Sequence, residues 1–209
     1  EYNKFCEVCE KDLDKNRFFL QNYNTDKNYR WGYAKLLRNN TVFNREKQEI
    51  LEMKRGLFID IFPCDNVPDK FIAKKIFSLK CFWVRKNSYA PVGAKYESNK
   101  IYRLFYKILS HNSLAYIRKL YDALACQCLD ENTKRVRIVA WSSKRENEGF
   151  PRKWMDDRIE YEFEGHYFWG PQDSDGFLKF IYGNYMKLPP IDQRITHSPA
   201  TYVRLLDGT

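Results

Sequence analysis

Residues 56–65 read GLFIDIFPCD and contain the clearest strand signal in the chain. Within them, residues 57–62 are β-branched and aromatic, follow a glycine and are stopped by a proline, a pattern typical of a bounded strand. Successive side chains alternate across a strand, so Asp60 points away from its two isoleucine neighbours. An unpaired carboxylate on a buried strand costs several kcal/mol. The pattern therefore predicts a cation or an active-site cleft beside Asp60, or an edge strand on which Asp60 faces water.

The segments on either side of this strand indicate an α+β fold. Helices are expected over residues 2–11, 69–83, 100–109, 113–128 and 176–182, and strands over residues 17–23, 136–141 and 158–169. The polar stretch 88–100 is expected to be a loop because it holds Pro91 and Gly93. We interpret residues 1–209 as a single domain with a helical region at about 67–128 between strand-rich ends.

Composition supports a folded core and a basic surface. Hydrophobic residues make up 44% and aromatic residues 17% of the 209 positions, and the formal net charge is +9. A positive charge suits nucleic acid, an anionic membrane surface or a phosphorylated substrate. A solvated basic surface is favoured over nucleic-acid binding, since no RNP1, KH or C2H2 pattern is present. No apolar run reaches the roughly 20 residues that span a bilayer, so we expect a cytoplasmic protein. Its basic, aromatic-rich surface would also permit peripheral contact with the inner face of a membrane.

The six cysteines include one CxxC pair, Cys6 and Cys9, and one CxC pair, Cys126 and Cys128. The second spacing does not fit a zinc ribbon or finger, and no histidine is near. Reduced structural thiols are therefore expected rather than a zinc site.

Three segments in the same order resemble the signatures of the LicD family of phosphocholine or related phospho-alcohol transferases. They are residues 35–41 (KLLRNNT), residues 56–65 (GLFIDIFPCD) and residues 181–190 (IYGNYMKLPP), the last followed by Arg194 and His197. In the family, the third segment usually has the pattern YGDYM-x-LPP, followed by R and H. The resemblance covers most of the chain, and three motifs in one order are more specific than any one of them.

The resemblance implies a nucleotidyltransferase-like mixed sheet with an inserted or appended helical region, in a superfamily that includes the fukutin-type transferases. It implies a divalent metal, Mg²⁺ or Mn²⁺, that bridges the phosphates of a CDP-choline-like donor. Phosphocholine then passes to a sugar hydroxyl of a cell-surface glycan such as lipopolysaccharide or teichoic acid. Asp60 corresponds to the third acidic position of that fold, with a role in metal support or as general base for the acceptor.

The remaining substrate-binding candidates lie in the two outer motifs. Lys35 and Arg38 are cations that can hold donor phosphates, although for each residue taken alone a solvated surface cation is the slightly favoured interpretation. Thr41, Tyr182 and Asn184 are the other candidates for substrate contact. Aromatic side chains, Tyr182 among them, can stack on a base or surround a choline trimethylammonium, but most of the 35 aromatic residues must belong to the core.

Two departures from the family pattern limit the expectation. The acidic cluster of the kind W-D-D-D-I-D is absent, so we expect an amino-terminally truncated domain whose principal metal ligands lie upstream of Glu1. Asn184 stands where the family usually has Asp, and it brings no charge. The alternative function is a non-catalytic module that binds a phosphorylated glycan or a nucleotide. Among the other aspartates, Asp65 is expected to cap the helix that follows it, and Asp173 or Asp175 the helix at Gly176.

Overall fold

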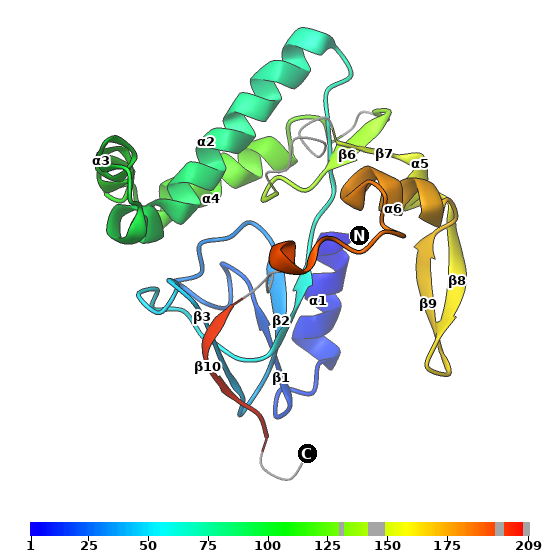
Figure 1. Cartoon of the computed structure of the whole chain (residues 1–209), viewed down its shortest axis with the longest axis horizontal. Helices are drawn as coiled ribbons and strands as arrows, with labels where there is room; N and C mark the ends of the chain where they lie inside the picture. The colour runs from blue at the N-terminus through cyan, green and yellow to red at the C-terminus, as the bar shows by residue number, and fades with distance from the viewer. Residues whose placement is uncertain (130–131, 142–148, 195–198, 207–209) are drawn as a thin grey trace. The chain divides into compact units, whose positions relative to one another are not determined.

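The computed structural model describes residues 1–129, 132–141, 149–194 and 199–206 (Figure 1). The helices are α1 (Tyr2–Asp12), α2 (Phe71–Tyr96), α3 (Lys100–Leu109), α4 (Leu114–Ala125), α5 (Lys153–Asp156) and α6 (Ser174–Tyr182). The strands are β1 (Phe18–Gln21), β2 (Ala34–Arg38), β3 (Val42–Arg45), β4 (Phe58–Ile61), β5 (Asp65–Asn66), β6 (Arg135–Arg137), β7 (Phe150–Pro151), β8 (Arg158–Phe163), β9 (His166–Pro171) and β10 (Ala200–Arg204). The α+β class expected from the sequence is confirmed.

The chain divides into two compact units, where the sequence predicted one domain. The first unit contains Glu1–Pro63, Cys81–Ala123 and the described residues after 198. The second contains Cys64–Lys80 and the described residues from 124 to 194. Among the described strands, every pair is antiparallel, and the sheets have two or three strands each.

The first unit is built on a three-stranded sheet in the order β1-β2-β4. The strand predicted from GLFIDIFPCD is confirmed as β4, which pairs with β2. Its register sets Asp60 opposite Lys35, and β1 sets Gln21 opposite Lys35 on the other side. A second, two-stranded sheet pairs β3 with β10.

The expectation of a loop over residues 88–100 is wrong, because α2 continues through Pro91 to Tyr96. A proline inside a helix lacks the N–H that the carbonyl four residues earlier would accept. Here the Arg30 guanidinium supplies the missing donor, since Nη2 lies 3.3 Å from the Asn87 carbonyl oxygen. Its Nε also donates to the Ser88 carbonyl oxygen at 3.0 Å. Pro91 therefore does not end the helix, because Arg30, 57 residues before Asn87, replaces the donor that the proline lacks.

Gly93, the other expected breaker, is a packing position. A Cβ at residue 93 would lie 2.4 Å from Cδ2 of Tyr106 on α3, closer than atoms can approach without displacement. Tyr106 is buried together with Ala90 and Leu109. The glycine therefore lets α2 and α3 pack closely, and the turn between them is short because Asn99 caps α3 by accepting from the N–H groups of Ile101 and Tyr102.

The second unit holds a small sheet in the order β5-β6-β7 and a separate hairpin, β8-β9. The strand expected over residues 136–141 is shorter than predicted and shifted to β6 (Figure 1). The single strand expected over residues 158–169 is instead a hairpin of two strands, β8 and β9. It turns at Glu164 and Gly165, both with positive φ, which suits the twist of a two-residue hairpin loop. In the part of the chain that the structure describes, no helix is long and apolar enough to cross a membrane.

Candidate functional site

A row of polar side chains crosses one face of the β1-β2-β4 sheet. Gln21, Lys35 and Asp60 are direct neighbours in register on the three strands, and the first two are buried. Ile59 on the opposite face of β4 is 68% exposed. Asp60 therefore occupies the inner face of its strand, and the alternation read from the sequence put it on the correct side of its isoleucine neighbour.

The sequence left open a cation or cleft beside Asp60 or an edge strand; β4 is an edge strand of the sheet, and Lys35 on the neighbouring strand supplies the cation. Its Nζ lies 3.0 Å from Asp60 Oδ1, and the side chains are 5% and 28% exposed respectively. The same ammonium lies 3.3 Å from the centre of the Phe58 ring, a cation–π contact strengthened by exclusion of water. Burial lowers the pKa of Lys35 to about 8, because water no longer solvates the charge, while Asp60 acts in the opposite direction and Arg45 adds to the lowering.

Two tyrosines belong to the same cluster. Burial, followed by a smaller contribution from Asp60, raises the pKa of Tyr33 above its usual value. The pKa of Tyr29 is raised chiefly by burial, with Tyr33 and then Asp60 as further causes. Both phenols therefore keep their protons at neutral pH. The Tyr33 ring centre lies 5.8 Å from Lys35 Nζ, so aromatic rings and one carboxylate surround the buried ammonium.

A small basic cavity adjoins Lys35 in the first unit. Its volume is about 20 Å³, and its cationic lining residues are Lys35, Arg45, Lys54 and Arg55. That volume accommodates about one water molecule. Arg55 donates from Nη2 to the carbonyl oxygens of residues 49 and 51, at 2.7 Å each, so it fixes the loop before β4. A phosphate would fit only after this loop moves outward.

The first two motifs of the resemblance interlock. Thr41 Oγ1 donates to the Arg38 carbonyl oxygen at 2.6 Å and accepts from the Leu57 N–H at 2.9 Å. The Arg38 N–H in turn donates to the Leu57 carbonyl oxygen at 2.8 Å. A Cβ on Gly56 would lie 2.9 Å from that same Arg38 carbonyl oxygen. Thr41 and Gly56 therefore hold β2 against β4, and this contact sets Lys35 opposite Asp60.

Arg38, expected to share the site with Lys35, lies on the other face of β2. The two residues are three positions apart, and an odd separation on a strand points side chains to opposite faces. Arg38 Nη1 donates to the Arg17 carbonyl oxygen at 3.2 Å, and its guanidinium carbon lies 5.1 Å from the centre of the Phe18 ring. The structure therefore separates Arg38 from the Lys35–Asp60 pair.

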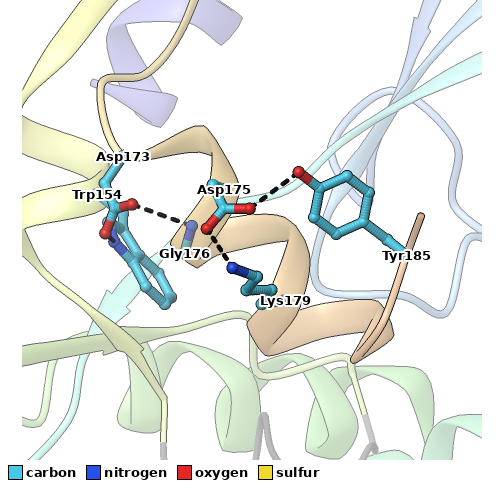
Figure 2. Close-up of polar contacts among 6 residues, drawn as sticks. All are labelled: Trp154, Asp173, Asp175, Gly176, Lys179 and Tyr185. Carbon is cyan, nitrogen blue, oxygen red and sulfur yellow. Dashed lines mark hydrogen bonds and ion pairs between the residues drawn. The ribbon is translucent and has the colours of Figure 1, made fainter.

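The third motif ends α6 in the second unit. Tyr182 is exposed at the last residue of the helix, and Gly183 follows with φ 72°, the left-handed conformation that favours glycine. Asn184 is exposed. The neighbouring Tyr185 donates its hydroxyl to Asp175 Oδ1 at 3.0 Å, which ties the motif back onto the first turn of α6 (Figure 2).

The two aspartates that flank this motif have structural partners (Figure 2). Asp173 caps α6 by accepting the Gly176 N–H at 3.0 Å, which confirms the expected cap, and it accepts the Trp154 indole N–H at 2.9 Å. These bonds, the indole one first, lower the pKa of Asp173. Asp175 pairs with Lys179 at 2.7 Å, and hydrogen bonds from Lys179 and then Tyr185 lower its pKa. His197 lies outside the described residues.

Asp65 was not expected to belong to a site. It lies on β5, paired in register with Arg137, so the prediction that it caps the following helix is wrong. It lines an open hollow of about 440 Å³ in the second unit, together with Asn66 and Arg152. The Arg152 guanidinium donates to the side chains of Asn66 and Thr133, and burial raises the pKa of Asp65 to about 6. No sequence pattern indicated the burial of Asp65, because it depends on strands that are distant in the chain.

The described residues do not fit a complete divalent metal site. His, Cys, Asp and Glu side chains within the described ranges nowhere form a group of three or more that could hold an ion. The Asp60 carboxylate is paired with a buried ammonium, which already neutralises its charge. The cysteines in this part of the chain are free thiols.

Comparisons with protein-family models, curated proteins and solved structures find no match to this chain.

Proposed function

We propose that this chain belongs to a LicD-type transferase, which passes phosphocholine or a similar phospho-alcohol from a CDP-activated donor to a hydroxyl of a cell-surface glycan. The observation that carries the proposal is the interlocking of KLLRNNT with GLFIDIFPCD. The two motifs contribute neighbouring strands, and Thr41 accepts the Leu57 N–H while Lys35 pairs with Asp60.

The reaction proposed is phosphoryl transfer. The sugar hydroxyl oxygen attacks the choline-bearing phosphorus, the bond from that phosphorus to CMP breaks, and the hydroxyl proton passes to a base. Positioning and charge neutralisation supply most of the catalysis in such transfers. Lys35 offers a dehydrated positive charge, which interacts with anionic oxygens more strongly than a solvated lysine does. Asp60 keeps that charge in place and is the proposed acceptor of the hydroxyl proton.

The proposed fold is the nucleotidyltransferase-like one, and the proposed cofactor is Mg²⁺ or Mn²⁺, which neutralises the donor phosphates in this class of reaction. Because the described residues supply no complete ligand set, the proposal assigns the principal ligands to the acidic cluster that the resemblance places ahead of Glu1.

The test compares two aspartate variants in the coding sequence extended upstream to its start codon. Asp60→Asn removes the proposed base, whereas Asp12→Asn changes an exposed aspartate at the end of α1 and serves as the matched control. Release of CMP from CDP-choline in the presence of a glycan acceptor should fall by about a hundredfold or more in Asp60→Asn and stay at the wild-type rate in Asp12→Asn. Wild-type turnover by Asp60→Asn would remove Asp60 from the mechanism.

The second candidate function is a non-catalytic module that binds a phosphorylated glycan or a nucleotide. Two observations favour it: Asp60 is neutralised by Lys35, and the adjoining cavity is lined by four cations. Calorimetric titration of residues 1–209 with CDP-choline and with phosphocholine, without metal, separates the two functions. Metal-independent binding that weakens in Lys35→Gln, together with no turnover in the extended protein, would favour the binding module.

A further inference from the structure

Helix α3 presents an aliphatic stripe to solvent. Ile101, Leu104 and Ile108 are 80%, 60% and 63% exposed. Their spacing of three and four residues places them on one side of the helix. Isolated exposed apolar residues are ordinary, but a continuous stripe on a folded helix indicates an interaction surface.

Cations accompany this stripe. The α3 sequence KIYRLFYKIL contains Lys100, Arg103 and Lys107 and no acidic residue. The nearest acid before the helix, Glu97, accepts the Asn99 N–H at 3.1 Å and so has a local role in the turn. A helix with aliphatic side chains on one face and only positive charges beside them has the composition of an interfacial, membrane-surface helix.

The opposite face of α3 is anchored, so the stripe cannot turn inward. Tyr106 and Leu109 are buried against Ala90 of α2, and Gly93 leaves only enough room for the Tyr106 ring. Lys86 Nζ donates to the Tyr106 hydroxyl at 2.8 Å. These contacts fix the rotation of the helix about its axis, and the three aliphatic side chains remain outward.

We propose that α3 docks onto an anionic membrane surface, with the stripe inserted at the level of the lipid headgroups and Lys100, Arg103 and Lys107 facing the lipid phosphates. The occupant is an anionic bilayer because positive charge flanks the stripe without any acid in the helix. A protein partner would need charges of the opposite kind around an apolar groove, and a second copy of this chain would bring the same cations together.

The experiment measures co-sedimentation of residues 1–209 with vesicles of equal parts phosphatidylglycerol and phosphatidylcholine, and with vesicles of phosphatidylcholine alone. Wild-type protein should bind the anionic vesicles and lose that binding at high salt, because the lipid charge is screened. Each cation replaced by Gln should weaken the binding by about fivefold. Leu104→Ser combined with Ile108→Ser should weaken it by about tenfold or more.

The β8–β9 hairpin supplies the matched control. In this hairpin, Phe163, Tyr167 and Trp169 are exposed to a similar degree. Their neighbours include two acidic residues on β8, Glu160 and Glu162. Phe163→Ser should therefore leave vesicle binding unchanged, which shows that exposed apolar area alone is not the cause.

Three results would overturn the proposal: no binding of wild-type protein to anionic vesicles, equal binding by the stripe variants, or a dimer in analytical ultracentrifugation that the stripe variants dissolve. Because the replaced side chains are exposed, each variant should fold as the wild type does. Circular dichroism and the melting temperature check this. The vesicle result does not depend on donor or acceptor chemistry, so its failure is separable from failure of the transferase function.

Discussion

Replacing Lys35 with Met tests whether a buried ammonium sits beside Asp60 in the folded protein. Burial lowers the pKa of Lys35 from 10.5 to about 8. This difference corresponds to about 3 kcal/mol between the protonated and the neutral form of the side chain. Because the unfolded chain binds this proton more tightly than the folded chain does, stability rises with pH between about 8 and 10.5 and is lowest below pH 8. Between pH 7 and 9.5 the expected gain is about 2 kcal/mol.

The measurement is urea unfolding at a series of pH values from 7 to 9.5, followed by tryptophan fluorescence. Lys35→Met should lose the rise of about 2 kcal/mol, since it has no proton to release there. Asp60 is 28% exposed and can be solvated by water when its partner is gone. Lys54→Met removes an exposed cation that also contacts an aromatic ring, at 3.9 Å from Phe19, and should keep the wild-type slope. Equal slopes for wild type and Lys35→Met would refute the buried-ammonium assignment.

Three further substitutions test the contacts that hold the first unit. Gly56→Ala should destabilise by about 1–3 kcal/mol, because the new Cβ meets the Arg38 carbonyl oxygen and neither backbone can easily move; the urea midpoint measures this, and an unchanged midpoint would contradict it. Arg30→Met should cost about 1–3 kcal/mol, because the Asn87 carbonyl oxygen, which Pro91 cannot bond, loses its side-chain donor. Hydrogen exchange of α2 measures this, and unaltered protection would contradict it. Asn99→Ala removes the α3 cap and should cost about 1 kcal/mol, seen as a lower melting temperature; an unchanged melting temperature would show that the cap is dispensable.

The strands and several helices could be predicted because their signals are local. β4 is enclosed by a glycine and a proline, and α3 and α6 each begin at a side chain that caps them. The continuation of α2 was not predictable, because it depends on Arg30, which is distant in the sequence and donates to the Asn87 carbonyl oxygen that Pro91 leaves without a donor. Local rules identified Pro91 as a breaker and carried no information about its partner.

The candidate site was predictable in part. Strand alternation separated Asp60 from its isoleucine neighbours and left open either a cation or cleft beside it or exposure to water on an edge strand. Lys35 was already a candidate residue, but its pairing with Asp60 depends on the register of two strands. The separation of Arg38 from Lys35 was readable from their odd spacing. The partial burial of Asp65 was not, since it arises from the packing of β5, β6 and the Arg152 side chain, whose positions only the folded unit defines.

The most direct test of the central claim is the identity of the reaction products. The coding sequence extended upstream to its start codon is incubated with CDP-choline, a divalent metal and a glycan acceptor, and the products are followed by ³¹P NMR and mass spectrometry. The account predicts CMP and a glycan phosphocholine diester in equal amounts, with both products lost in Asp60→Asn and kept in Asp12→Asn. CMP without the diester, or no turnover of the donor by a folded extended protein, would contradict it.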